Sequence, residues 1–305
     1  MDDYTYDTKS WLDQRFKKVD KDGIYYAHQP IYGFRQGHSE PGMVERYMIT
    51  YQITNALAHL NFSSLLDVGG AEGYKAALIR SLFDVNVRSV DLSGEACLRA
   101  KEIFDVDGEP VDIHKLPYQD GEFDVVLCSE TLEHVANIEG ATKELLRVCN
   151  KAVVITVPRE PIEVVEQNIK DNVPHAHIHS LDTNSFDFAL PELNDVIVRR
   201  FHNPFFQKLA GIADGMKKTH VAERPRLLTN AYNAILPMLR YFFGIRTIGA
   251  LIRFDDYFAN TLPFYSGMIF ILLKDPESYE AHPKKQVSVR QIMGFKVPLH
   301  YPGWQ

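Results

Sequence analysis

The chain has 305 residues, 45% of them hydrophobic and 24% charged, which is typical of a globular protein with a sizeable apolar core. Its formal net charge of −7 argues against a broad basic surface, so we expect no nucleic-acid partner. Three widely spaced cysteines without a CxxC pair argue against a disulfide framework and favour a reducing compartment. The acidic N-terminus lacks the apolar core of a secretion signal, and no run of 18 apolar residues occurs. The sequence therefore predicts a cytoplasmic protein without a membrane-spanning segment.

The first 60 residues are rich in aromatic side chains and are interrupted by glycines. A helical pattern runs from about Val44 to Leu60. We therefore expect residues 1–60 to form a helical cap segment, followed by one domain over residues 61–305.

Strand-like and helix-like patterns alternate after this segment. The strand patterns are 63–69, 87–93, 109–114, 123–129 and 151–158, with helix patterns at 73–83, 93–104 and 138–149 between them. Ser93 is the expected N-cap of the second of these helices. Two more strand patterns, 194–201 and 266–275, enclose a mostly helical insertion at 205–262. This alternation predicts a doubly wound α/β fold with a parallel sheet.

A glycine-rich loop follows the first strand pattern in the stretch LLDVGGAEGYKAALIR. Its glycines are Gly69, Gly70 and Gly73. Glycine at a strand-to-helix turn brings the backbone close to a ligand. Asp91 ends the next strand, 18 residues after Gly73, where an acidic residue meets ribose hydroxyls in dinucleotide-binding folds. A structural turn beside a solvated carboxylate is the alternative interpretation.

The segment 111–135 indicates which nucleotide cofactor the glycine-rich loop binds. It holds an Asp after the expected third strand, an LP-aromatic turn, a polar loop, an FD-apolar strand and an LEH-type helix start. These are Asp112, 116–118, 120–121, 123–124 and 132–134. In this combination the sequence resembles the class I S-adenosylmethionine-dependent methyltransferases, in particular the small-molecule group with a type 11-like domain. The resemblance covers residues 60–160 well and continues weakly through the last two strands.

The resemblance implies a Rossmann-like sheet of seven strands with the last one antiparallel, and S-adenosylmethionine as the cofactor. Carried over position by position, the resemblance assigns the methionine part of the cofactor to Asp67, Gly69, Gly70, Ala71 and Gly73. It assigns the ribose to Asp91 and Leu92, and the adenine to Asp112 and Ile113. Cys128 and Ser129 would line the cofactor at the strand end that faces the acceptor. Ala71 departs from the glycine that is usual in the family. Because alanine disfavours positive φ by about 1 kcal/mol, we expect a slightly different loop conformation.

A catalytic base is the hardest role to assign, because methyl transfer mainly needs alignment of the reactants and exclusion of water. A hydroxyl acceptor must in addition lose a proton. His134 is the candidate base, since it begins the helix after the fourth strand near the acceptor side. A structural role at that helix start is the alternative, and Glu130 is a second candidate base.

Three histidines recur at period two in the stretch PHAHIHS: His175, His177 and His179. In a strand they would share one face, which suits a metal ion. Lining of the acceptor pocket and ordinary surface positions are the alternatives. Since no acidic or cysteine motif lies near them in the sequence, we predict no metal site.

The predicted function is methyl transfer to oxygen or nitrogen of a small-molecule acceptor, with a glycan or lipid-linked cell-envelope intermediate as one acceptor class. The insertion at 205–262 combines cations with apolar residues. It is interpreted as a lid with core helices, or alternatively as a surface for peripheral membrane contact. The rival functions are a non-catalytic S-adenosylmethionine-binding or scaffold protein and a nicotinamide-dependent oxidoreductase, whose GxGxxG spacing this loop does not match. The acceptor and the oligomeric state are not fixed by the sequence.

Overall fold

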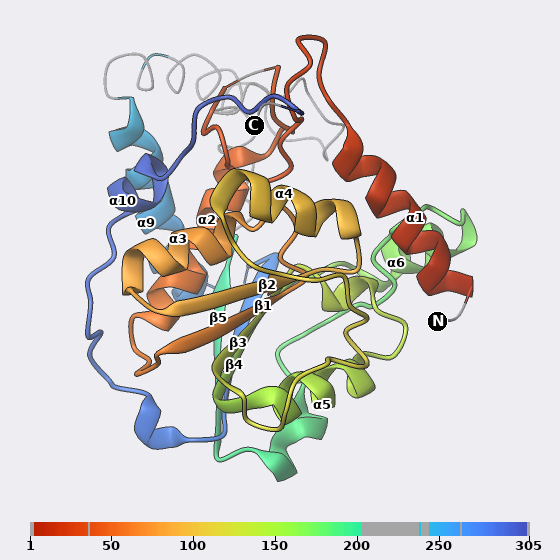
Figure 1. Cartoon of the computed structure of the whole chain (residues 1–305). Helices are drawn as coiled ribbons and strands as arrows, with labels where there is room; N and C mark the ends of the chain where they lie inside the picture. The colour runs from red at the N-terminus through yellow and green to blue at the C-terminus, as the bar shows by residue number, and fades with distance from the viewer. Residues whose placement is uncertain (1–2, 36, 203–237, 239–243, 263, 304–305) are drawn as a thin grey trace.

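The computed structural model describes residues 3–35, 37–202, 238, 244–262 and 264–303. In this part of the chain, one sheet of six strands has the order β2-β1-β3-β4-β6-β5 (Figure 1). The strands are β1 Ser64–Val68, β2 Asn86–Val90, β3 Phe123–Ser129, β4 Cys149–Pro158, β5 Asp195–Phe201 and β6 Gly267–Leu273. Neighbours among the first four are parallel, whereas β6 runs antiparallel to both β4 and β5. The doubly wound α/β fold and the antiparallel last strand are therefore confirmed.

The expected seventh strand is wrong. Residues 109–114 form only one parallel bridge, between Asp91 and Pro110, next to a backbone hydrogen bond of 2.8 Å from Val111 N to the Asp91 carbonyl. Proline has no backbone N–H, so a ladder cannot continue through Pro110. The pattern of alternating apolar residues was present, but this proline leaves the segment as an edge loop.

The helices predicted at 44–60, 73–83, 93–104 and 138–149 begin and end close to these positions, whereas α1, α6 and α10 had no predicted bounds. The helices are α1 Asp3–Lys17, α2 Met43–Leu57, α3 Tyr74–Phe83, α4 Gly94–Phe104, α5 Ile138–Val148, α6 Ile162–Lys170, α9 Ile245–Thr261 and α10 Val289–Gly294, with short 3₁₀ turns η1 Leu132–His134, η2 Asp187–Glu192 and η3 Pro276–Ser278. Ser93 is the N-cap of α4, as predicted, and its side chain accepts a hydrogen bond from Ala96 N. The helix predicted to end near residue 60 ends at Leu57. Of the predicted insertion, α9 is helical, and residues 205–237 and 239–243 lie outside the described residues.

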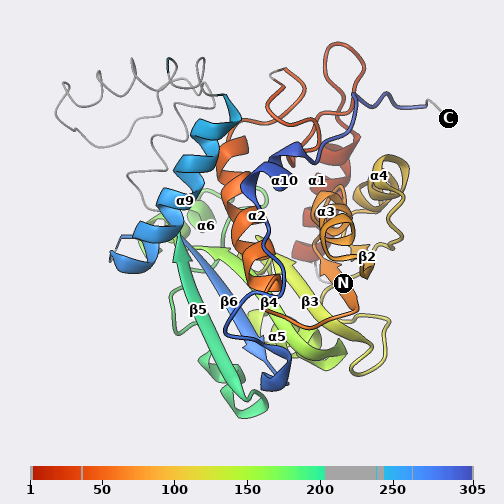
Figure 2. The ribbon, with the colours of Figure 1, turned by 90° about the vertical axis from the view of Figure 1, so that its left-hand side faces the viewer.

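Helices cover both faces of the sheet (Figures 1 and 2). One face packs against α2, α3, α9 and α10, and the other packs against α5. Strand residues between these layers, such as Val125, Val154 and Ile271, are completely buried. The continuous apolar sequences of β4 and β6 follow from this burial on both faces.

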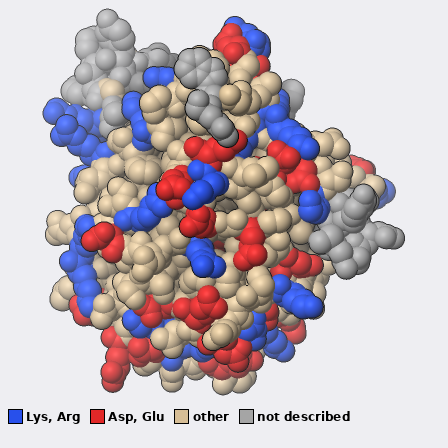
Figure 3. Space-filling model, viewed as in Figure 1, with Lys and Arg blue, Asp and Glu red and all other residues tan. Residues whose placement is uncertain are grey.

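Charges of both signs are mixed on the surface. Figure 3 shows Lys and Arg side chains interspersed with Asp and Glu over the face in view. Within the described ranges, no helix is both long enough and apolar enough to cross a bilayer.

Successive strands are added on one side of β1 and on the opposite side of β3, so the strand order reverses between these two neighbours. From β1 the chain moves outward to β2, and from β3 it moves the opposite way to β4. The loops after β1 and β3 therefore diverge and leave a crevice at the carboxyl ends of these strands. Ligands of open α/β sheets bind at such a switch point.

The packing of β5 against β6 can be tested by a substitution at Gly267. A Cβ at Gly267 would lie 2.4 Å from the ring of Phe201, its partner residue on β5. We expect Gly267→Ala to lower the free energy of unfolding by about 1–3 kcal/mol through overpacking. Urea denaturation measures this loss, and Gly94→Ala is the matched control because no atom lies within 4 Å of its added Cβ. Equal midpoints for the two variants would contradict this packing.

Candidate functional site

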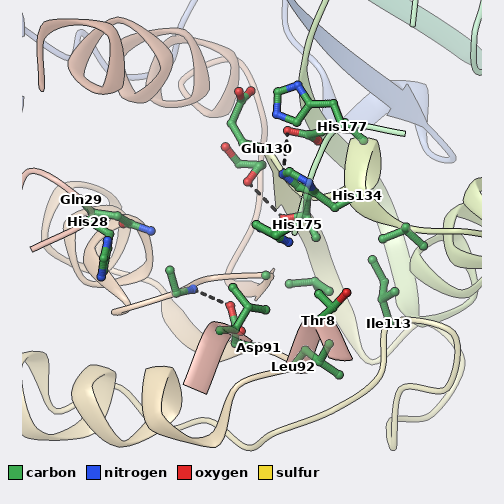
Figure 4. A pocket seen from close by; sticks show the side chains of 18 of the residues that line it. Thr8, His28, Gln29, Asp91, Leu92, Ile113, Glu130, His134, His175 and His177 are labelled. Carbon is green, nitrogen blue, oxygen red and sulfur yellow. Dashed lines mark hydrogen bonds and ion pairs between the residues drawn. The ribbon is translucent and has the colours of Figure 1, made fainter. Parts of the chain in front are cut away.

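A cavity of about 630 Å³ opens at the switch point, which is a usual size for a small-molecule site (Figure 4). Its walls come from α1, the segment 28–30, the start of α2, the loops after β1, β2 and β3, and the segment 175–177. In Figure 4, Asp91 and Leu92 lie on one side of the cavity, and His134, His175 and His177 gather on the other. The cavity therefore has two chemically different ends.

The glycine loop closes over the first end. Gly69 and Ala71 line the cavity, whereas Gly70 and Gly73 do not. A Cβ at Gly70 would lie 2.0 Å from Ser89 Oγ, so the backbone fits there only without a side chain. Ala71 adopts φ 50°, the left-handed conformation that a glycine would take easily. The alanine therefore keeps a glycine-like turn at this position.

Asp91 holds this loop in place. Its Oδ2 accepts a hydrogen bond of 2.9 Å from Ala71 N, and its Oδ1 accepts one of 2.9 Å from Ser93 N (Figure 4). Burial raises the pKa of the Asp91 carboxyl to about 6, although these two backbone donors act in the opposite direction. One buried carboxyl thus joins the glycine loop to the start of α4 and also faces the cavity.

Asp67 and Cys128 lie behind the cavity wall. Both are buried, and neither lines the cavity, so their predicted contact with a ligand finds no support in the geometry. Burial raises the pKa of Asp67 to about 6, and the charge of Lys75 opposes this rise. Because a Cβ at Gly70 would also come within 3.0 Å of the Asp67 carboxylate, Asp67 supports the glycine loop from beneath.

The remaining predicted cofactor residues lie at the cavity wall. Leu92, Asp112, Ile113 and Ser129 all line it. Asp112 Oδ1 accepts hydrogen bonds from His114 N at 3.0 Å and from His114 Nδ1 at 2.7 Å. These bonds fix the Asp112 carboxylate at the rim beside the apolar side chain of Ile113.

His134 lies at the other end, in the 3₁₀ turn η1 and not at the start of α5 as predicted. Its Nδ1 is 3.0 Å from the Ala176 carbonyl, to which it donates, and its ring stacks on His175 with centroids 3.8 Å apart. Burial, with a smaller effect of His175 and His177, lowers the pKa of His134 to about 2. The ring is therefore a neutral imidazole at ordinary pH.

The three histidines of the PHAHIHS stretch do not share a face. The segment is an irregular loop, with His175 at φ 52°, so the strand needed for that arrangement is absent from these described residues. His175 and His177 line the cavity. His179 instead bonds the Val135 carbonyl at 2.7 Å through Nε2. The common face that a strand would have given is not formed, because hydrogen bonds to the turn at 132–135, and not a ladder, order this loop.

Sequence reasoning missed much of the cavity wall. The missed residues are Thr8, Trp11, Arg15, His28, Gln29, Lys75, Glu133, Glu160 and His202. Helix α1 reaches the cavity because Ser93 Oγ donates a 2.6 Å hydrogen bond to Asp13 on α1. The aromatic-rich composition of residues 1–60 was the only signal for this contribution.

Comparison with known proteins decides the family. A family model described as "Methyltransferase domain" matches residues 66–157, which include the glycine loop, Asp91, Asp112 and η1. Residues 66–157 therefore belong to a methyltransferase domain. The resemblance inferred from the motifs is thereby confirmed over this range.

Two curated relatives share sequence with the methyltransferase domain. Norajmaline N-methyltransferase of Rauvolfia serpentina is 31% identical over 120 residues, which are 37% of this chain and 39% of that protein. Ajmaline N-methyltransferase of the same plant is 29% identical over 105 residues, which are 31% of this chain and 35% of that protein. The chain thus spans less than two fifths of the length of these relatives.

A solved structure shares the fold of the methyltransferase domain. Geranyl diphosphate C-methyltransferase from Streptomyces coelicolor A3(2), in complex with Mg²⁺, geranyl diphosphate and S-adenosyl-L-homocysteine, superposes with a TM-score of 0.51 at 17% identity. The match covers 89% of this chain and 98% of that one. At this identity the likeness concerns the fold.

The neutral state of His134 is directly measurable. Because the pKa of His134 falls to about 2, its ring should stay unprotonated from pH 8 to pH 4.5 in the folded methyltransferase domain. In the unfolded chain the ring takes up a proton near pH 6.5, so this residue lowers the stability of the fold progressively below that pH. Ring proton and carbon NMR shifts, assigned with His134→Gln, follow the titration with and without urea. A folded-state midpoint near pH 6.5 would contradict the burial described here.

Proposed function

We propose that this protein transfers a methyl group from S-adenosylmethionine to oxygen or nitrogen of a small-molecule acceptor. The main support is one continuous cavity. Asp91 and the glycine loop line one end of it, and Glu130 and His134 line the other. A cofactor at the first end would direct its reactive group toward an acceptor held at the second.

The described residues fit this cofactor. Asp91 offers its remaining lone pairs to the ribose hydroxyls, and Asp112 offers an oxygen to the adenine amino group beside Ile113. The backbone at Gly69 and Ala71 leaves room for the methionine part, since a Cβ at Gly69 would lie 2.2 Å from Thr131 Oγ1. When bound, the cofactor supplies a methyl group on a positively charged sulfur, which needs no covalent activation by the protein. The S-adenosyl-L-homocysteine in the geranyl diphosphate C-methyltransferase structure supports this choice.

At the acceptor end, Glu130 is the better proton acceptor. Burial lowers the pKa of His134 to about 2, and a group of such low basicity is poorly matched to an acceptor hydroxyl. Burial instead raises the pKa of Glu130, which brings it closer to the pH at which a general base works best. In this proposal Glu130 removes the acceptor proton, and His134 is a neutral imidazole at the same end of the cavity.

In this proposal helix α1 also helps to cover the site. Trp11 and Arg15 of α1 line the cavity, and Arg15 donates hydrogen bonds of 2.9 Å to both Glu40 oxygens. This ion pair stiffens the cap segment 1–60 internally, and the 2.6 Å hydrogen bond from Ser93 Oγ to Asp13 joins the cap to the sheet domain. In this proposal the cap excludes water from the reacting groups. The described residues give no comparable support for a glycan or lipid-linked acceptor, because that idea rested on an insertion that lies largely outside them.

Cofactor binding is tested at Asp91. We expect Asp91→Ala to weaken S-adenosylhomocysteine binding roughly 10- to 100-fold, because hydrogen bonds to a charged group are lost. Titration calorimetry measures the affinity, and Asp107→Ala is the control because Asp107 is an exposed carboxylate that pairs with Lys101. A thermal shift with NAD in parallel separates a nicotinamide-dependent enzyme from a methyltransferase. Wild-type affinity in Asp91→Ala would refute the assignment.

The raised pKa of Asp91 also predicts a pH dependence. Below about pH 6 this carboxyl takes up a proton and becomes a poorer acceptor for ribose hydroxyls. S-adenosylhomocysteine affinity should therefore fall about tenfold from pH 7.5 to pH 5. Asp67, whose pKa is also raised to about 6, is the competing explanation. Asp67→Asn should keep the dependence if Asp91 causes it, and a flat profile in that variant would assign it to Asp67.

A further inference from the structure

Three side chains at the acceptor end have the composition of a metal site. Glu133, His134 and His177 all line the cavity, and each offers a ligand atom within 4.8 Å of the other two. His134 Nε2 lies 3.9 Å from Glu133 Oε1. Two imidazoles and one carboxylate form a donor set that suits divalent transition metals.

The Glu133 carboxylate is the observation that points to a bound cation. Glu133 is only 1% exposed, and among the described residues its Oε2 has no hydrogen-bond partner. A buried carboxylate without a partner is costly, and a metal ion would satisfy it.

Backbone hydrogen bonds pre-form the site. Glu133 and His134 belong to η1, and His177 belongs to the loop 175–179. Three bonds join these segments: His134 Nδ1 to the Ala176 carbonyl at 3.0 Å, Ile178 N to the Glu133 carbonyl at 2.8 Å, and His179 Nε2 to the Val135 carbonyl at 2.7 Å. A carbonyl on one imidazole nitrogen fixes the ring orientation of metal-ligating histidines in the same way.

Other charged groups face the same place. Glu160 lies 3.2 Å from His177 Nδ1. Lys75 also lines the cavity and shares its wall with these groups. Glu130, Glu133 and Glu160 therefore place three carboxyl groups around this end, which favours a cation there.

We propose that Glu133, His134 and His177 bind one divalent transition-metal ion, with coordination positions open toward the cavity. Bonds of about 2.1 Å in a tetrahedral site need ligand atoms about 3.4 Å apart, so the side chains must close by roughly an ångström. This proposal differs from the sequence prediction of no metal site. That prediction looked for an acidic partner near the histidines in the sequence, whereas Glu133 comes from another segment.

The ion would hold an oxygen atom of the acceptor. Coordination lowers the pKa of a bound hydroxyl, so its proton passes more easily to Glu130 or to water. This role rests on the proposed methyl transfer, whereas the binding of the ion does not.

The test measures metal binding by the full-length, tag-free protein. After dialysis against a chelator, Zn²⁺ is added, and calorimetry and elemental analysis give the affinity and the stoichiometry. We expect one ion per chain, bound at least tenfold more weakly by Glu133→Gln and by His177→Ala. His114→Ala, which removes a cavity histidine outside the cluster, should bind Zn²⁺ as the wild type does.

Two results would overturn the proposal. One is a wild-type protein that retains no ion, or that binds Zn²⁺ with the same affinity as Glu133→Gln. The other is loss of binding only in His38→Ala, because this would place the ion at the separate cluster of Asp20, Asp22 and His38. S-adenosylhomocysteine affinity is measured on the same samples. If the wild type did not bind S-adenosylhomocysteine, the proposed methyl transfer would be contradicted, and the conclusion on metal binding would not change.

Discussion

The Asp91 carboxylate is the contact on which the first end of the cavity depends. It accepts one hydrogen bond from Ala71 N in the glycine loop and one from Ser93 N at the start of α4. Ser93 in turn donates to Asp13, so the same short chain of contacts brings α1 to the cavity. Such bonds to a charged group contribute about 1.5–3 kcal/mol each, which offsets part of the cost of burying the carboxylate. The left-handed Ala71 is held by this arrangement despite its side chain.

The second end is ordered by hydrogen bonds to backbone carbonyls that join the turn at 132–135 to the loop 175–179. The backbone carbonyls of Glu133, Val135 and Ala176 are all used as acceptors in these bonds. Side chains of Glu130, Glu133 and Glu160 then converge on the cavity. A rigid backbone with buried acidic groups is suited to hold a cation or an acceptor proton, and unsuited to a purely apolar ligand.

Local sequence patterns predicted most of the sheet and helices, because periodicity and capping act over a few residues. Ser93, the strands 123–129 and 151–158, and the helix at 138–149 are examples. The failures have long-range causes. Pro110 ends a strand-like pattern because a neighbouring strand would need its missing N–H. The histidine loop is shaped by η1, more than 40 residues earlier in the chain. Glu133 escaped notice because only the fold brings it to His177.

The match to the methyltransferase domain covers the first end of the cavity better than the second. Residues 66–157 include the glycine loop, Asp91 and Asp112, so motif information covers the first end of the cavity. Trp11, Arg15, Glu160, His175 and His177 lie outside this range and complete the second end. A domain of this kind can therefore keep its cofactor end while the flanking segments reshape the acceptor end. On the proposed function, the identity of the acceptor depends on the chemistry of those flanking residues, which include the imidazoles of His175 and His177 and the carboxylate of Glu160.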